Sequence, residues 1–193
     1  MHSPAAQAYR GASEFLVEVV AKVDPQQYEH AGLGHWSVRE LIAHANRAHT
    51  LVVAYLEDPV DPGQVPADYF APASIDARAR QAVLDLGNDP VARVREAAQR
   101  ASDAISDAPP RAKVGTPAGA MLLDQYLPSR TTELLIHGVD LARATNVAVV
   151  PPPEAMKSCL RFLADRAAQL DRALPVVLAL SGRDRLPDDF SVF

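Results

Sequence analysis

Residues 133–144 read Glu-Leu-Leu-Ile-His-Gly-Val-Asp-Leu-Ala-Arg-Ala. Their apolar residues recur at helical spacing, which predicts an α-helix with one side against a core. Glu133 and His137 are four residues apart, so a helix places both side chains on one face, one turn apart. A carboxylate in such apolar surroundings needs a partner, which is either His137 in a buried hydrogen bond or a metal ion.

The helix around this stretch is predicted to span residues 118–145 and to carry an unusual polar stripe. The stripe consists of Tyr126, Arg130, Glu133, His137 and Asp140, which follow three- and four-residue steps. A long helix with a polar stripe pointing inward indicates a site inside a helical bundle.

Two residues of the stripe have candidate roles beside the Glu133–His137 pair. Asp140 is positioned either to orient the His137 imidazole or to form an ion pair with Arg143. Arg130 is a candidate for binding an anionic substrate.

A second informative stretch, residues 35–44, reads His-Trp-Ser-Val-Arg-Glu-Leu-Ile-Ala-His. Ser37 and Glu40 form the sequence signature of a capping box, which predicts a helix from there to about residue 57. Trp36 precedes the cap and is expected to act as a hydrophobic staple. His44 falls on the apolar side of this helix, as a core residue, a partner of Glu40 or a metal ligand. Two histidines and one glutamate are the inventory of a three-ligand zinc site with an open position.

The remaining periodicity predicts an all-α protein of four or five antiparallel helices. Further helices are expected at 5–23, at 74–106 with a break at 87–90, and at 153–172. Residues 58–73 are rich in proline, glycine and aspartate and are predicted to form a loop. Short extended segments are expected at 111–117 and 175–182. The predicted domain organisation is a helical bundle over residues 1–173 and a strap or tail over residues 174–193, with no full second domain.

The length, net charge and cysteine content of the chain exclude several classes of protein. The chain has 193 residues, which suits one domain, and a net charge of −5, which favours neither nucleic acid nor an anionic membrane as a partner. No apolar run approaches the roughly 20 residues of a membrane helix, and no signal peptide is recognisable. The single cysteine, Cys159, excludes an internal disulfide, lies in an apolar run, and is expected to be a buried thiol in a reducing cytoplasm.

Residues 36–44 resemble the Trp-Thr/Ser-Val-Arg-Asp/Glu-Leu-x-x-His signature of the mycothiol-dependent maleylpyruvate isomerase family. Residues 133–144 are similar to its second signature, Glu-x-x-x-His-x-x-Asp-Leu-x-x-Ala. The resemblance covers roughly residues 5–173 in motif order and spacing. It implies the DinB/YfiT-like four-helix bundle of up-down-down-up type, here with extra short helices and a short extended C-terminal segment.

The resemblance also implies the site and its partners. By the resemblance, His44, Glu133 and His137 would be the metal ligands. Asp140, Arg130 and Tyr126 are candidates, from their places in the polar stripe, for residues that support a ligand or bind substrate. Zinc would be the metal, and mycothiol, a low-molecular-weight thiol of actinobacteria, would be the co-substrate. The expected activity is S-transfer to a small electrophile or its cis–trans isomerisation, in a cytoplasmic protein that could form a homodimer.

Three alternatives remain open from the sequence. The first is a metal-dependent hydrolase, in which the open position holds hydroxide. The second is a non-catalytic metal- or ligand-binding regulatory module. The third is a purely structural metal site closed by a fourth protein ligand, for which His49 and Asp140 are the candidates.

Overall fold

The structure, a computed structural model, describes residues 3–58, 60–61, 63, 65–69, 71–109 and 111–192. The expected loop at 58–73 is therefore covered in part, and its Pro59 and Pro62 lie outside the described residues. The helices and strands are α1 (Pro4–Lys22), the 3₁₀-helix η1 (Pro25–Gln27), β1 (Ala31–Leu33), β2 (Trp36–Ser37), α2 (Val38–Glu57), α3 (Pro72–Leu86), α4 (Pro90–Asp107), β3 (Lys113–Thr116), β4 (Gly119–Leu122), α5 (Leu123–Thr145), α6 (Pro153–Gln169) and α7 (Ala173–Leu180).

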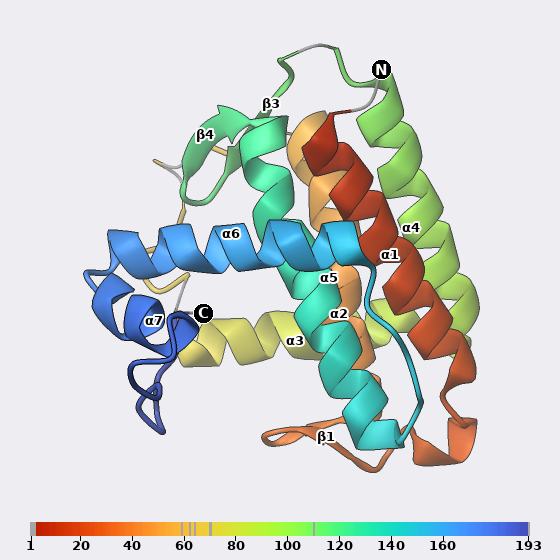
Figure 1. Cartoon of the computed structure of the whole chain (residues 1–193). Coiled ribbons are helices and arrows are strands. Elements are labelled where there is room, and N and C mark those ends of the chain that lie inside the picture. Colours follow the sequence, from red (N-terminus) through yellow and green to blue (C-terminus); the bar gives the residue numbers. More distant parts are fainter. Residues whose placement is uncertain are drawn as a thin grey trace.

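Four helices form a closed bundle, which confirms the predicted all-α class. In this bundle α1 packs on α5 and α4, and α2 packs on the same two helices. Helices α1 and α5 run in one direction while α2 and α4 run in the other, so the topology is up-down-down-up (Figure 1). The core between them is made of fully buried aliphatic side chains such as Leu16, Leu41, Leu127 and Leu134. Such burial supplies the main stabilising free energy of a bundle.

Local sequence signals explain where the bundle helices begin. Asp89 caps α4, because its carboxylate accepts a hydrogen bond from the N–H of Ala92 at 3.0 Å, and Pro90 occupies the first helical position. The expected break at 87–90 is therefore confirmed, and it separates α3 from α4.

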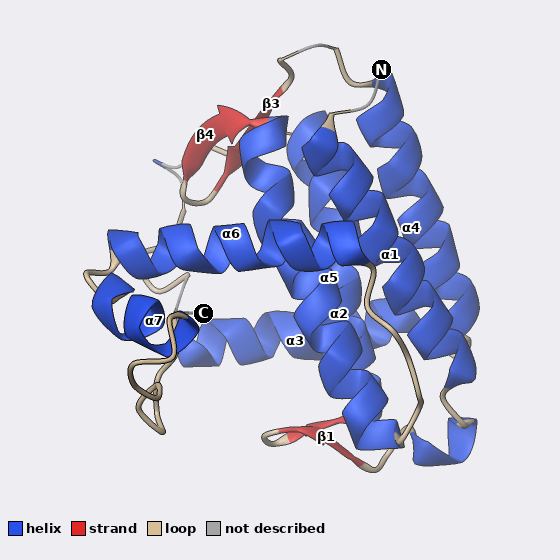
Figure 2. Cartoon of the chain, in the orientation of Figure 1, coloured by secondary structure: helices blue, strands red, loops and turns tan. Residues whose placement is uncertain are grey.

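Two small hairpins lie at opposite ends of the bundle (Figure 2). The β1–β2 hairpin precedes α2, and the β3–β4 hairpin precedes α5. The second hairpin corrects the prediction that the helix starts at residue 118. Residues 119–122 pair with β3 instead, because Gly119 takes a positive φ of 117° and Thr116 accepts and donates hydrogen bonds within the turn.

Helix α6 lies across the bundle on the side of α1 and α5, and α7 follows it at one end (Figure 1). The prediction of an extended segment at 175–182 is wrong, since Ala173–Leu180 is helical. Pro175 is tolerated because it stands in the first turn, where its missing N–H would have no helical partner. None of the eight residues of α7 is buried. Among the described residues, no helix is both long and apolar enough to cross a bilayer.

Candidate metal centre

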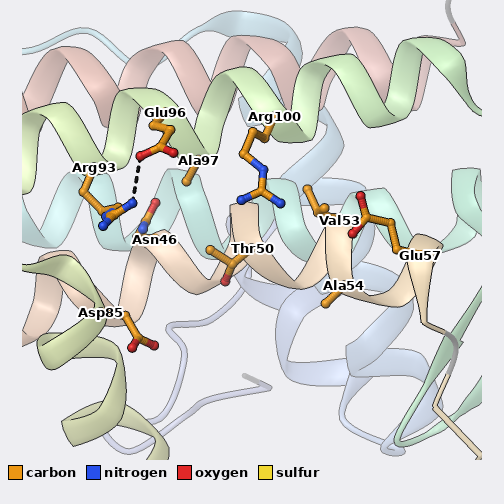
Figure 3. Close-up of a pocket in the computed structure, with 10 residues that line it drawn as sticks. All are labelled: Asn46, Thr50, Val53, Ala54, Glu57, Asp85, Arg93, Glu96, Ala97 and Arg100. Carbon is orange, nitrogen blue, oxygen red and sulfur yellow. Dashed lines mark hydrogen bonds and ion pairs between the residues drawn. The ribbon is translucent and has the colours of Figure 1, made fainter.

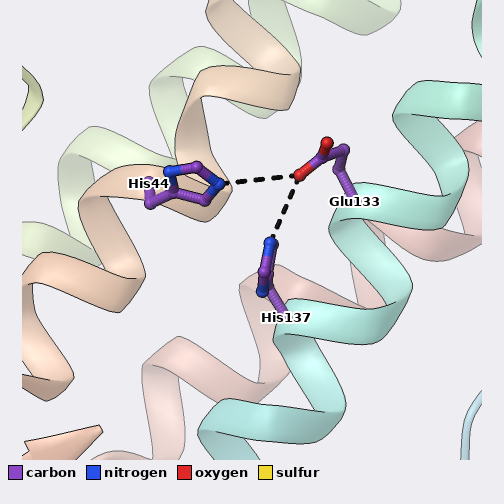
Figure 4. A group of neighbouring side chains, drawn as sticks. All are labelled: His44, Glu133 and His137. Carbon is purple, nitrogen blue, oxygen red and sulfur yellow. Dashed lines mark ion pairs between the residues drawn. The ribbon is translucent and has the colours of Figure 1, made fainter. Parts of the chain in front are cut away.

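The start of α2 determines where His44 points. Ser37 Oγ accepts from the N–H of Glu40 at 3.3 Å, and Glu40 Oε2 accepts from the N–H of Ser37 at 2.8 Å. The predicted capping box is thus formed and sets the first residue of the helix. With that phase, His44 lies on the face of α2 that is directed at α5 (Figure 4).

Three side chains from the two quoted stretches meet between α2 and α5. His44 Nε2 lies 3.7 Å from Glu133 Oε2, and His137 Nε2 lies 3.3 Å from the same oxygen. The two imidazole rings meet edge to face, with their centroids 4.9 Å apart. Figure 4 shows both Nε2 atoms directed at the carboxylate. One ligand atom from each residue lies within 4.8 Å of the other two, so the cluster offers three metal-binding donors at one point.

The Glu133 carboxylate is held in its ionised form. Burial by itself would raise its pKa, but the imidazoles of His137 and His44 and the Arg130 guanidinium outweigh this effect. The pKa of Glu133 therefore lies well below its ordinary value. The carboxylate is therefore negatively charged near neutral pH.

Asp140 takes the first of its two predicted roles. Its Oδ2 lies 3.3 Å from His137 Nδ1. Glu133 Oε2 and Asp140 Oδ2 thus place a hydrogen-bond acceptor at each ring nitrogen of His137, and a metal ion at Nε2 would leave Nδ1–H to donate to Asp140. Burial tends to lower the pKa of His137, yet Glu133 and Asp140 together raise it. Within the described residues, Asp140 forms no ion pair with Arg143.

Arg130 and Tyr126 border the cluster from the preceding turns of α5. Arg130 Nη2 lies 3.7 Å from Glu133 Oε1, and the guanidinium carbon lies 5.2 Å from the Tyr126 ring centroid. Burial raises the pKa of Tyr126 to about 12, so its hydroxyl stays protonated near neutral pH.

Two residues of the cluster, His44 and Glu133, line a cavity of about 600 Å³, which is within the range of small-molecule sites. Among the described residues, four arginines line this cavity, whereas Glu133 is the one carboxylate in its lining. Its lining residues are His44, Arg47, Ala48, Leu51, Tyr55, Tyr69, Ile75, Arg78, Thr116, Pro117, Ala118, Met121, Gln125, Tyr126, Ser129, Arg130, Glu133, Phe162, Arg166 and Gln169. Such an excess of cationic side chains favours a ligand that carries negative charge.

Several cavity residues were not predicted from the sequence. Arg78 places its guanidinium carbon 4.0 Å from the Tyr69 ring centroid, and Tyr55 lies beside Tyr126 with ring centroids 5.8 Å apart. Arg47 follows His44 by three residues and could have been found from that spacing, since residues three apart share a helix face. Tyr69 and Arg78 carry no comparable signal, because they reach the cavity from a loop and from α3.

A second groove, of about 410 Å³, lies between α2 and α4 and lacks this chemistry (Figure 3). Its charged residues are of both signs, and Arg93 is paired with Glu96 at 2.8 Å. None of the three clustered donors lines it.

The other sequence candidates lie away from the cluster. His49 is fully buried and bonds with Ser13 at 2.9 Å and with Asn46 at 3.1 Å, so it is not a fourth ligand. Asp140 stands behind His137 and is not among the clustered donors either. Cys159 is buried as expected, and burial raises the pKa of its thiol. His2 lies outside the described residues.

A comparison with protein families matches the part of the chain that contains the cluster. Residues 9–142, well over half of the chain, match the family model of the mycothiol maleylpyruvate isomerase N-terminal domain. The chain belongs to this family. Its fold is accordingly that of the DinB-like superfamily of helical bundles. No match was found among curated proteins or among solved structures. The match to the isomerase N-terminal domain family contains all three clustered residues but ends before α6, which supplies Phe162, Arg166 and Gln169 to the cavity.

The donor set fits a divalent metal ion. Nitrogen and oxygen ligands lie about 2.0–2.1 Å from zinc, so two ligands in a tetrahedron are separated by about 3.3 Å. The separations of 3.3 and 3.7 Å between the Nε2 atoms and Glu133 Oε2 are close to that value. Two neutral imidazoles and one carboxylate are also a donor set of catalytic zinc sites, in which a fourth position stays open.

Proposed function

We propose that this protein is a metal-dependent enzyme that uses a low-molecular-weight thiol to modify a small electrophile. The proposed ligands are His44, Glu133 and His137, the proposed metal is zinc, and the proposed thiol is mycothiol. The observation that carries the proposal is a cluster of three donors, two of which, His44 and Glu133, line a cavity, since a metal held there could meet a substrate. Family membership supports the choice of thiol.

Some residues of the chain would bind the metal and others would bind the substrate. Bound zinc would supply Lewis-acid stabilisation of a thiolate near neutral pH. With Nε2 bound to the metal, the Nδ1–H of His137 would donate to Asp140, and Glu133 would contribute one negative charge to the donor set. Arg47 and Arg130, which line the cavity, would bind an anionic group of the electrophile.

The thiolate would form a bond between its sulfur and an electrophilic carbon. In isomerisation, addition to a carbon–carbon double bond leaves a single bond that can rotate, and loss of the thiolate restores the double bond. In S-transfer, a leaving group departs with its electron pair and the thioether remains. Both reactions need the same thiolate, so the proposal covers the two outcomes.

The first experiment measures bound metal by elemental analysis of the wild-type protein, His137→Ala and the control His35→Ala. We expect about one zinc or other divalent ion per chain in the wild type and in the control, and its loss in His137→Ala. The control removes an exposed histidine that lies outside the cluster. Absence of metal in the wild type, together with no uptake on titration with Zn²⁺, would overturn the proposal.

A second measurement tests the role of the thiol. The metal-loaded protein is incubated with maleylpyruvate or with a chromogenic aryl halide, with and without mycothiol. We expect turnover of at least one electrophile that requires the thiol. Hydrolysis that proceeds without thiol would instead favour the metal-dependent hydrolase, and bound metal without any turnover would favour a binding module.

A further inference from the structure

The two histidines of the cluster are supported in different ways. His137 is oriented by Asp140, whose carboxylate lies 3.3 Å from its Nδ1. Among the described residues, His44 has no such carboxylate, and its nearest charged partner is Glu133, on the opposite nitrogen, at 3.7 Å. Some other contact must therefore define the orientation of the His44 ring.

That contact is with Trp36, the single tryptophan of the chain. The indole and the His44 imidazole have their centroids 4.4 Å apart with an interplanar angle of 37°, which is a close, tilted ring contact. The His44 ring also makes an edge-to-face contact with the ring of His137. The imidazole thus contacts two other rings, the indole and a second imidazole.

The backbone that carries Trp36 is itself tightly held. Trp36 pairs with Leu33 in the β1–β2 hairpin, and the next residue, Ser37, is the N-cap of α2. Gly32 packs so closely on this strand that a Cβ atom would lie 2.7 Å from the carbonyl oxygen of Ser37. The N–H of Val38 donates to the carbonyl of His30 at 2.9 Å. The hairpin therefore fixes the indole relative to α2.

We propose that Trp36 is a positioning residue of the metal site, which holds the His44 imidazole with Nε2 directed at Glu133 and His137. The inference rests on the proposed metal site. Without the indole, the His44 side chain regains rotamer freedom that metal binding would have to remove. Supporting contacts of metal ligands typically change metal affinity by about 10-fold to 100-fold, and we expect Trp36→Ala to weaken Zn²⁺ binding by such a factor.

The test measures Zn²⁺ affinity by competition with a chromogenic chelator for the wild type and four variants. Trp36→Ala and Trp36→Leu remove the flat ring, and we expect weaker binding in both. Trp36→Phe retains a ring face and should restore most of the affinity. His35→Ala is the matched control, because it removes a neighbouring hairpin side chain whose ring makes a T-shaped contact with Trp36. This variant should bind Zn²⁺ as the wild type does.

Far-UV circular dichroism and thermal unfolding establish which variants are folded. If Trp36→Ala fails to fold, the comparison of Trp36→Leu with Trp36→Phe decides. Equal Zn²⁺ affinity of the wild type and a folded Trp36→Leu would overturn the inference and leave the proposed function intact. A wild type that binds no Zn²⁺ would overturn both.

A readout that needs no metal examines the contact itself. Because Trp36 is the sole tryptophan, all tryptophan fluorescence of the protein comes from this residue. Its emission therefore responds to the ring of His44, the proposed ligand with which it is in contact. We expect His44→Ala to change the emission intensity of the metal-free protein, whereas His30→Ala should not. Unchanged emission in His44→Ala would contradict the ring contact between Trp36 and His44 on which the inference depends.

Discussion

At the scale of single residues, the cluster depends on which nitrogen of each imidazole is available. At His137, Asp140 lies behind the ring and outside the donor set and offers an acceptor to Nδ1, so that Nε2 would be the nitrogen available to a metal. Supporting carboxylates of this kind fix the tautomer and raise the basicity of a ligating histidine. Asp140 is therefore, like Trp36, a residue whose replacement would change the proposed metal affinity without altering a donor.

Replacement Asp140→Asn is expected to weaken Zn²⁺ binding by about 10-fold to 100-fold, because the amide lacks the negative charge that favours Nδ1–H. The fold should be unaffected, since the side chain is one-fifth exposed. Chelator competition gives the affinity, and Asp103→Asn, which alters an exposed carboxylate of α4, is the control. Wild-type affinity in Asp140→Asn would show that the Asp140 contact does not support the ligand.

The donors could be predicted from the sequence, but their surroundings could not. Glu133 and His137 are one turn apart on one helix, so their proximity follows from helical spacing alone. His44 required a second stretch with its own capping box. Tyr69 and Arg78 reach the cavity through the packing of a loop and α3 against the bundle, and no local pattern encodes that packing. Trp36 was predicted to be a hydrophobic staple, whereas in the structure its ring contacts the rings of His44 and His35.

At the scale of elements, α5 carries two of the three donors, Glu133 and His137, and also packs most extensively on α1. Gly138, next to His137, permits this close approach, because a Cβ atom there would lie 2.6 Å from Cε1 of Phe15. The Phe15 ring is buried and has little room to move. The position of α5, and with it the position of the donors, depends on the absence of a side chain at residue 138.

We expect Gly138→Ala to lower the free energy of unfolding by about 1–2 kcal/mol, because overpacking of the α1–α5 contact outweighs the better helix propensity of alanine. Gly11→Ala in α1 is the matched control. Its Cβ atom would lie 3.6 Å from Pro152, an ordinary contact, so this change should stabilise by up to about 1 kcal/mol. Urea unfolding measures both, and a stabilised Gly138→Ala would refute the steric argument.

Two elements show where local sequence patterns are insufficient. Residues 118–122 contain good helix formers, yet pairing with β3 makes 119–122 a strand. Residues 175–180 begin with proline and two valines, which favour an extended chain, yet they are helical with Pro175 in the first turn. In both cases the pattern was too short for periodicity to outweigh the surroundings. The long helices, with three or more turns of consistent spacing, were predicted with boundary errors of a few residues.

At the scale of the whole molecule, a buried polar group ties α1 to α2. His49 is fully buried, with Ser13 of α1 on Nε2 and Asn46 of α2 on Nδ1. Burial lowers the pKa of His49 to about 3, so the imidazole is neutral in the folded protein near neutral pH. In the unfolded chain the same imidazole titrates near 6.5.

Between these two values the unfolded state binds more protons than the folded state, so the contribution of His49 makes the protein less stable as the pH falls from about 6.5 toward 3. One such group contributes a slope of up to about 1.4 kcal/mol per pH unit. Urea unfolding of the wild type and His49→Gln at pH 7, 6, 5 and 4.5 should therefore give a shallower loss of stability in the variant. Carboxylates and the other histidines are common to both proteins, so the difference between the slopes belongs to residue 49. His30 is exposed, so His30→Gln serves as the control and its stability should vary with pH as that of the wild type does. Parallel curves of stability against pH for His49→Gln and the wild type would mean that His49 accepts a proton in the folded state.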